Sequence, residues 1–404
     1  MEQQPLPTLL NCLEQVPDPR RRRGQRFEWR ILLAIISAAM ASGQKTPHAI
    51  ADWVQEHAQA LLAQLRPAKG RLPSATTLWR VLRDVNRYQV EQQVAAHNQA
   101  LAEADTTPGS LVARNGERLR GQAVDGKEVR GTSAHGQPLV LVSLARHGSG
   151  YVLGEVAVPG KGHELSAVPG LLAGRDLRGT VTTMDALLTQ RAIARQILEQ
   201  HGHYLMVVKP NQPELFRKLE LLFTTPPVPA LPGELLTYRS TDKAHGRLET
   251  RTLECSTALN SYLDWPGVAQ VMRRTCRRVI LRTGEIETEV HYGITSLGRD
   301  LAGPRELEFF WRGHWTIENC DHYVRDETLG EDRSQTHTGN APQVLAALRN
   351  GLLALLRYRG WSNIAAALRH YGASPQKASL LIGWNATRKS LDPEQKSIDR
   401  PTFQ

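Results

Sequence analysis

Three acidic residues of this chain have the side chains and surroundings needed to hold divalent cations. Asp125 lies in the segment VDGK, Asp185 in TTMDA and Glu318 in HWTIEN. In-line cleavage of a phosphodiester is stabilised by two divalent ions about 3.5–4 Å apart, which convergent carboxylates can hold. Mg²⁺ and Mn²⁺ favour such oxygen ligands. The chain has 40 acidic residues, and most exposed acids are simply solvated, so spacing alone does not select these three.

The sequence around two of the acids predicts their place in a sheet. Residues 121–129 and 179–185 have strand patterns, and apolar positions precede both Asp125 and Asp185. We therefore expect each carboxylate at the end of a strand, where open α/β sheets place their ligands. A carboxylate in such a place is costly to desolvate without a cation, which favours a metal site.

The third acid lies on a predicted helix with unusual neighbours. Spacings of i−7, i−4, i and i+7 place four residues on one helical face: Trp311, His314, Glu318 and Arg325. Arginine can clamp a phosphate and aromatic rings can stack on a base, so this face suits a DNA groove. Asn319 and His322 lie on adjoining faces, where they would support the ligands. The alternative is an amphipathic helix with its aromatic residues in the core and an ordinary ion pair outside.

Changes in the hydrophobic pattern and in polarity along the sequence divide the chain into five segments. Helical spacing gives way to strands that alternate with helices, then to a β-rich stretch, a second helical part and a polar tail. Alternating strands and helices predict an α/β architecture. We expect a helical N-terminal domain over 1–108 and the first part of a catalytic core over 109–222. A β-rich insertion is expected over 223–300, the C-terminal helical part of the core over 301–384 and the tail over 385–404.

Several elements inside these segments can be predicted individually. Residues 31–41 are an uninterrupted apolar run that predicts a buried helix, and an amphipathic stretch follows at 48–65. The insertion shows strand patterns at 249–255, 268–282 and 287–294, and a last helix is expected at 342–358.

Charge and composition restrict the class of partner. Lys plus Arg number 50 and Asp plus Glu number 40, which gives a net charge of +10. This excess favours a polyanionic partner, with nucleic acid before an anionic membrane surface. The longest apolar run, 31–41, is far shorter than the roughly 20 residues of a membrane span. The four cysteines show no CxxC spacing, so we expect a protein of the reducing cytosol.

The N-terminal segment offers a candidate DNA-binding unit. A break near Pro67 and a good N-cap at Ser74 precede an expected helix over 75–86. In a helix-turn-helix this helix would place Arg80 and Arg83 in a major groove. A helical domain for dimerisation or packing is the equal alternative.

Several blocks of the sequence, in order along nearly the whole chain, resemble one known family. The blocks are LEQVPDPRRRRGQRF, AIADWV, LPSATTLWRVL, AVDGKEVRGT, TTMDALLTQ, HYLMVVKPNQ, HGRLETR and RGHWTIENCDHYVRDETLGEDRS. They are similar to bacterial insertion-sequence transposases of the DDE superfamily, specifically the ISAs-type or H-repeat-associated group. The chain departs from that group at Pro210, where glycine is usual, and at Asp321 and Arg325, where apolar residues are usual.

The resemblance implies a ribonuclease-H-like catalytic core, interrupted by the β-rich insertion before the helix of Glu318. Its acid triad would be Asp125, Asp185 and Glu318, holding two divalent ions, Mg²⁺ or Mn²⁺. Related transposases carry a Tyr, Arg, Glu, Lys pattern on this helix, at the offsets that Trp311, His314, Glu318 and Arg325 occupy here. Arg325 and Lys209 are the candidates for contacts to the DNA backbone.

The function expected from residues and resemblance together is that of a cytoplasmic DNA transposase, associated with the nucleoid when bound. It would act as a homodimer on double-stranded DNA, with the element ends and target DNA as partners. The first alternative is a DNA-binding regulator derived from a transposase, catalytically inactive or domesticated. The second is a plain nuclease on the same core, which would cut without preference for end sequences and would not join strands.

Overall fold

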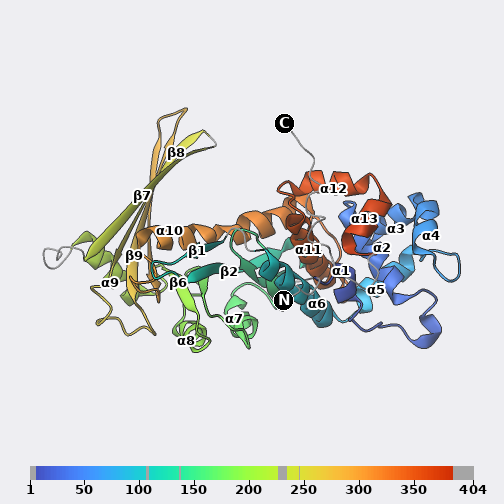
Figure 1. Cartoon of the computed structure of the whole chain (residues 1–404), viewed down its shortest axis with the longest axis horizontal. Helices are drawn as coiled ribbons and strands as arrows, with labels where there is room; N and C mark the ends of the chain where they lie inside the picture. Colours follow the sequence, from blue (N-terminus) through green and yellow to red (C-terminus); the bar gives the residue numbers. More distant parts are fainter. Residues whose placement is uncertain (1–5, 106–108, 136–137, 226–233, 245, 385–404) are drawn as a thin grey trace.

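One mixed sheet runs through the middle of the molecule, between a body of helices at one end and a projecting β-ribbon at the other (Figure 1). The computed structural model describes residues 6–105, 109–135, 138–225, 234–244 and 246–384. The predicted polar tail, 385–404, lies outside these described residues.

Five strands form the part of the sheet that carries the predicted acids: β2 (Arg118–Val129), β3 (Leu139–Arg146), β4 (Val152–Val158), β5 (Thr180–Met184) and β6 (His203–Val208). Their order is β4-β3-β2-β5-β6. Strands β2, β3 and β4 pair antiparallel, whereas β5 and β6 run parallel to β2. Parallel strands need crossovers, which α7 (Glu164–Leu172) and α8 (Arg191–Glu199) supply. The predicted α/β class is confirmed.

The β-rich segment extends this same sheet. Its strands are β7 (Leu235–Ala244), β8 (Arg247–Ser256), β9 (Gln270–Ile280) and β10 (Ile286–Thr295), and β10 pairs antiparallel with β6. Helix α9 (Pro213–Thr224) precedes them and packs on β9 and β10. Strand β7 was not predicted, because it is almost entirely solvent-facing and lacks the apolar alternation that marks a half-buried strand. The short β1 (Ser110–Val112) pairs with β2.

A long helical rod crosses one face of the sheet and enters the helical body (Figure 1). It begins as α10 (Pro304–Gly313) and continues into two π-helical stretches, η3 (Ile317–His322) and η4 (Val324–Thr328). Each π turn holds one more residue than an α turn, and such turns are often found at functional sites. The rod therefore does not keep the α-helical register that the sequence analysis assumed.

The helical body is built from both ends of the described chain. Its N-terminal helices are α1 (Leu9–Leu13), α2 (Trp29–Ala41), α3 (Pro47–Glu56), α4 (Ala58–Leu65), α5 (Ala75–Asp84) and α6 (Arg87–Ala104). Its C-terminal helices are α11 (Ala341–Tyr358), α12 (Ile364–Gly372) and α13 (Pro375–Ile382). The two sets share one hydrophobic core. Short 3₁₀ turns, η1 (Arg22–Gly24) and η2 (Arg130–His135), complete the described helices.

This shared core differs from the predicted division of the chain. Helices α11 to α13 pack with the N-terminal helices rather than only completing a catalytic core, and α12 and α13 lie beyond the helix expected to be last. The buried helix at 31–41 is confirmed as α2. The expected helix at 48–65 is two helices, broken at His57. In the described part of the chain, no helix is long and apolar enough to cross a membrane.

Candidate active site

Alternation along β2 decides which side of the sheet each residue faces. Leu119 and Ala123 pack toward the rod of α10 and η3, whereas Val124 packs into the core under α7 and α8. Asp125 has the parity of Leu119 and Ala123, so its side chain lies on the side of the rod. Its predicted place at a strand end is wrong, because β2 continues to Val129.

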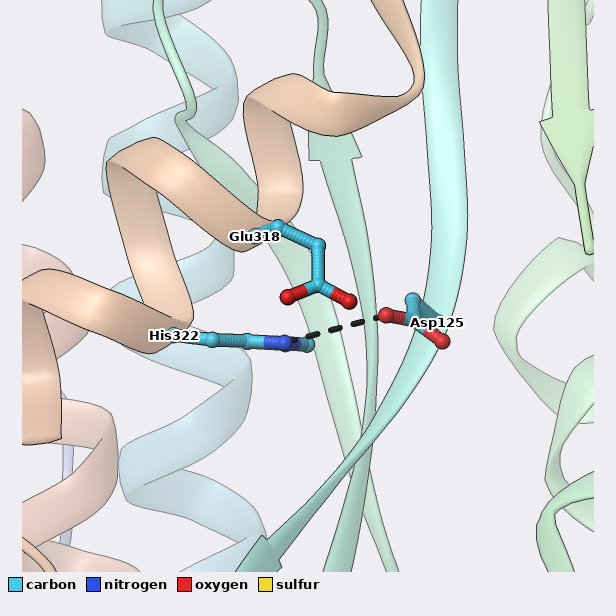
Figure 2. Close-up of side chains that lie close together, drawn as sticks. All are labelled: Asp125, Glu318 and His322. Atoms are coloured by element: carbon cyan, nitrogen blue, oxygen red, sulfur yellow. Dashed lines mark ion pairs between the residues drawn. The ribbon is translucent and has the colours of Figure 1, made fainter. Parts of the chain in front are cut away.

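The rod brings a carboxylate and an imidazole to Asp125 (Figure 2). Glu318 and His322 both come from η3, and potential ligand atoms of these two residues and Asp125 all lie within 4.8 Å of one another. Nδ1 of His322 is 3.7 Å from Oδ2 of Asp125. Asp125 is half-buried, His322 is buried and Glu318 is exposed, so the group opens to solvent on the Glu318 side.

Asp185 comes from the strand next to Asp125. Val124 of β2 pairs with Met184 of β5 in parallel register, so the two aspartates follow on neighbouring strands. Oδ1 of Asp185 accepts hydrogen bonds of 3.1 Å from the backbone N–H groups of Leu187 and Leu188, which fix its carboxylate. Asp185 lies directly after β5, as predicted. It is not part of the 4.8 Å group of Asp125, Glu318 and His322.

The three carboxylates act on one another electrostatically. Burial, the charge of Glu318 and, more weakly, the charge of Asp185 together raise the pKa of Asp125 to about 7, against the hydrogen bond from the backbone N–H of Gly126. Burial, together with the cations Arg325 and Lys127, lowers the pKa of His322 to about 3, so its imidazole is neutral. Excess negative charge beside a neutral imidazole is a donor set that fits a divalent cation.

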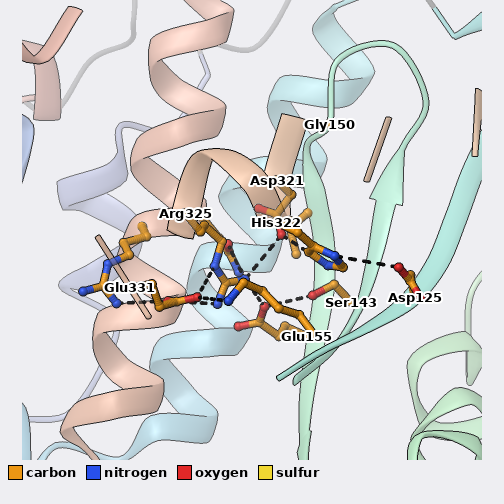
Figure 3. Close-up of polar contacts among 12 residues, drawn as sticks. Asp125, Ser143, Gly150, Glu155, Asp321, His322, Arg325 and Glu331 are labelled. Atoms are coloured by element: carbon orange, nitrogen blue, oxygen red, sulfur yellow. Dashed lines mark hydrogen bonds and ion pairs between the residues drawn. The ribbon is translucent and has the colours of Figure 1, made fainter. Parts of the chain in front are cut away.

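A buried ionic cluster lies directly behind this site (Figure 3). We call it the Arg325 cluster; its members are Lys127, Glu155, Asp321, Arg325, Glu331 and Arg349, all buried. Arg325 contacts Glu155 at 2.5 Å, Glu331 at 2.9 Å and Asp321 at 3.4 Å. Glu331 also receives Arg349 at 3.0 Å and Lys127 at 3.2 Å. The cluster ties β2 and β4 to the rod and to α11.

Two residues predicted to contact DNA are buried in the structure. Arg325 is 0% exposed and fully engaged with carboxylates, so the prediction that it binds the DNA backbone is wrong. Trp311 is 2% exposed and packs in the core between α10 and the sheet, so its predicted DNA contact is wrong as well. The π turns are the physical reason for the first error, because residues seven apart do not stay on one face through them.

A buried polar chain behind Asp185 was missed by sequence reasoning. The ring of His147 lies 2.9 Å from Oγ1 of Thr183, which lies 3.0 Å from Nδ1 of His314. Two glycines make room for the His147 ring: a Cβ at Gly121 would approach it to 2.1 Å, and one at Gly313 to 2.2 Å. His314 therefore faces the strand of Asp185, and it is half-buried.

The other predicted site residues are spread over the surface. Lys209, Asn319 and Arg80 are exposed. Arg83 is half-buried, lies over the ring of Trp79 and pairs with Asp84 at 2.5 Å, so much of its charge is compensated locally.

The acids at the end of the rod and just after it are already engaged in ion pairs. Lys127 lies 2.5 Å from Asp326 and 3.6 Å from Asp332, and Glu331 belongs to the Arg325 cluster. These residues therefore hold the rod against β2. Lys127 itself, in the VDGK segment, was not singled out by the sequence analysis.

An α/β sheet with convergent acids on neighbouring strands and a facing helix defines a metal-dependent enzyme that acts on phosphodiesters. The family model described as "Transposase DDE domain" matches residues 116–356, and the model described as "DDE_Tnp_1-associated" matches residues 10–97. The chain belongs to the DDE transposase family, as the sequence predicted.

Two relatives carry names that agree with this assignment. The chain is 26% identical over 87% of both chains to "Putative transposase YncI" of Escherichia coli O157:H7. It is 25% identical to the H repeat-associated protein YhhI of Escherichia coli K12, over 87% of this chain and 90% of that one. The ISAs-type subgroup stays a prediction. A piggyBac transposase synaptic complex with hairpin DNA matches with a TM-score of 0.44 and 12% identity, over 95% of this chain and 77% of that one.

Proposed function

We propose that this chain is a DNA transposase that binds the terminal inverted repeats of its own element, cleaves the DNA there and joins the ends to target DNA. The observation that carries the proposal is the convergence of Asp125 and Glu318 beside Asp185, from two neighbouring strands and a facing π-helical rod. The strand order β4-β3-β2-β5-β6 supports a ribonuclease-H-like core.

Asp125, Asp185 and Glu318 would hold two divalent ions, Mg²⁺ or Mn²⁺. When bound, the ions supply charge stabilisation at the attacking and leaving oxygens of the phosphodiester. The protein positions the ligands: backbone N–H groups fix Asp185, and the Arg325 cluster holds η3 against β2 and β4. Neutral His322, beside Asp125, would keep the carboxylates oriented or serve as a further ligand.

The DNA contacts would come from exposed residues on the sheet and on the helical body. Lys209 directly follows β6, and Arg80 lies on α5. Both side chains are exposed and would contact phosphates. Asn319 is exposed beside Glu318 and His314 is half-buried near Asp185, so these two would touch DNA or the ligands. Two element ends must be held together for strand transfer, and a homodimer on DNA would do this. The protein would act in the cytoplasm, at the nucleoid.

The test is strand cleavage and joining on a labelled duplex that carries the repeat from the DNA flanking the gene. Wild type is compared with Asp125→Asn, Asp185→Asn and Glu318→Gln, in Mg²⁺ and in Mn²⁺. The matched control is Glu327→Gln, an exposed acid on the same rod that pairs with Arg333 at 3.3 Å. Cutting at the repeat end is expected from wild type and from the control, and from none of the three variants, with DNA binding intact in all.

The outcomes separate the candidate functions. Tight binding of the repeat without cutting in either metal would identify a DNA-binding regulator. Cutting without end preference or joining would identify a plain nuclease. Cutting that survives Glu318→Gln would remove Glu318 from the metal site.

A further inference from the structure

A second polar site lies on the opposite face of the sheet from the acids. A cavity of about 390 Å³ opens between the C-terminal end of α6, the start of β2 and β5, and the turn after α7. Arg120 and Gln122 line it from β2, and their parity is that of Val124, which faces away from the rod. The cavity is therefore separate from the group around Asp125.

Three arginines line this cavity: Arg120, Arg146 and Arg175. Among the residues that the structure describes, no carboxylate forms an ion pair with any of them. Nε and Nη1 of Arg146 are out of contact with solvent and have no hydrogen-bond partner. A buried guanidinium without an acceptor is costly, so its presence indicates a missing anionic partner.

Arg175 is held in position, but its charge is not neutralised. Arg175 donates from Nε to the carbonyl oxygen of Leu171 at 2.7 Å and from Nη2 to that of Leu153 at 2.8 Å. Both acceptors are neutral backbone groups. Arg120 is exposed at the mouth. The pKa of Arg146 is lowered to about 10, first by burial and then by the positive charge of Arg120. The positive charge of Arg175 acts in the same direction.

The two acids that line the cavity compensate little of this charge. Asp176 is occupied by Arg178, whose guanidinium donates to both of its carboxylate oxygens. Glu103 is exposed and accepts a hydrogen bond of 2.8 Å from Gln99. Its charge favours the charged form of Arg146. The cavity is left with an excess of fixed positive charge and with donors that have no acceptor.

We propose that this cavity, which we call the arginine pocket, binds a phosphate group through Arg120, Arg146 and Arg175. Guanidinium groups present several donors that match phosphate oxygens, and three of them converge here from three different elements. The group is either a phosphate of a DNA backbone passing the outer face of the sheet or a free phosphate or pyrophosphate ion. The assignment does not depend on the acids of the opposite face.

Isothermal titration calorimetry of the full chain with inorganic phosphate and with pyrophosphate tests the proposal. Wild type is compared with Arg146→Gln, Arg146→Lys and Arg120→Gln. The control is Arg178→Gln, which removes one positive charge a few residues from the pocket but from a pair already matched with Asp176. We expect saturable binding to wild type and to the control, and binding about tenfold weaker or more in the two Gln variants of the pocket, since each loses a charge-assisted contact. Arg146→Lys should show a smaller loss, because it keeps the charge but not the forked donors.

A second arm identifies the source of the phosphate. If a short DNA duplex competes with phosphate for wild type, and Arg120→Gln lowers the salt dependence of DNA binding by about one phosphate contact, the ligand is DNA. If duplex and phosphate bind independently, the ligand is the free anion. Absence of phosphate binding to wild type would overturn the proposal, as would equal binding by Arg120→Gln and Arg178→Gln. Arg120 is exposed, so its variant keeps the test decisive even if the Arg146 variants do not fold.

Discussion

The acid site and the Arg325 cluster are adjacent, share β2 and η3, and use their charges in opposite ways (Figure 3). In the cluster, the buried cations Lys127, Arg325 and Arg349 meet the buried acids Glu155, Asp321 and Glu331. At the acid site, carboxylates face one another and raise the pKa of Asp125. Charges matched within the protein hold elements together, whereas charges left unmatched are available to a ligand.

The same helical rod supplies both regions, and its π turns make this possible. Glu318 and His322 reach Asp125, while Asp321 and Arg325, each three residues further along, point into the closed cluster. A substitution in one region should therefore affect activity, and a substitution in the other should affect stability. The first three predictions below test that separation, in order of the expected size of the effect.

Glu318→Gln should abolish activity without a cost in stability. Loss of a metal ligand removes several kcal/mol of charge stabilisation, so repeat cleavage should fall about 1000-fold or more. The free energy of unfolding should stay the same or rise, because the substitution removes a charge that repels Asp125. Cleavage rates and urea unfolding on the same preparations measure both effects. A large loss of stability would show that Glu318 is structural.

Arg325→Met should give the reverse result on stability. It leaves Glu155, Asp321 and Glu331 buried without their main cation, and breaking such a buried network costs about 3–5 kcal/mol. Arg333→Met is the control, since its pair with Glu327 is exposed and should cost below about 1 kcal/mol. Urea unfolding of the two variants measures the difference. Equal stabilities would mean that the cluster does not hold the rod.

His322→Asn should show an effect between these extremes. His322 contacts Asp125 but is neutral, so its loss disturbs the orientation of the site without leaving a buried charge unpaired. Residues that support metal ligands typically contribute a factor of about 10–100 in metal affinity or activity. Mn²⁺ titration followed by calorimetry should show the weaker binding directly. The exposed His163→Asn is the control, and a His322→Asn variant that binds Mn²⁺ like this control would assign His322 no role at the metal site.

Glu91→Gln should produce a change in stability that is absent at low pH and appears only as the pH rises. Burial, with help from Glu155 and against Arg87, raises the pKa of Glu91 from 4.5 to about 8. Between these two pKa values the folded state keeps a proton on Glu91 that the unfolded state loses. The stability that protonated Glu91 allows is therefore complete below pH 4.5 and is lost as the pH rises through about 8. The variant should match wild type at pH 4.5 and exceed it at pH 8.5 by up to about 4–5 kcal/mol, since each unit of the pKa shift corresponds to about 1.4 kcal/mol.

Urea unfolding of both proteins at several pH values checks this last prediction. Taking the difference between variant and wild type cancels the titration of all other groups. A difference that does not change between pH 4.5 and 8.5 would mean that Glu91 titrates normally and that the region between α6 and β4 is hydrated.

The sequence alone located the acids but not their surroundings. Asp125 and Asp185 follow apolar strand patterns, and these local signals survive in β2 and β5. The face of Glu318 could not be predicted, because a helical wheel assumes α-helical turns and the rod turns π-helical at Ile317. Arg325 was expected at the DNA backbone because α-helical spacing placed it on the face of Glu318. Its carboxylate partner Glu155 is distant in the sequence, so no local pattern indicates the buried cluster.

The shared helical core escaped prediction for a related reason. Packing of α11 against α6 joins residues about 250 apart in sequence, as the hydrogen bond from Asn98 to the carbonyl oxygen of Asn350 illustrates. Periodicity predicts that a helix has a buried face, but it does not say which element covers that face. The arginine pocket could not be predicted for the same reason, because its three arginines are far apart in the sequence and form no motif.

The most direct test of the metal site is a change of metal preference at Asp185. Thiolate ligands favour softer ions than Mg²⁺, so Asp185→Cys should be inactive on the labelled repeat in Mg²⁺ and regain cleavage in Mn²⁺. Asp185→Ser, which offers no thiolate, should stay inactive in both. That pattern would place Asp185 on a metal ion during cleavage. Cleavage by Asp185→Cys at the wild-type rate in Mg²⁺ would contradict the account, because the carboxylate would then not be a ligand.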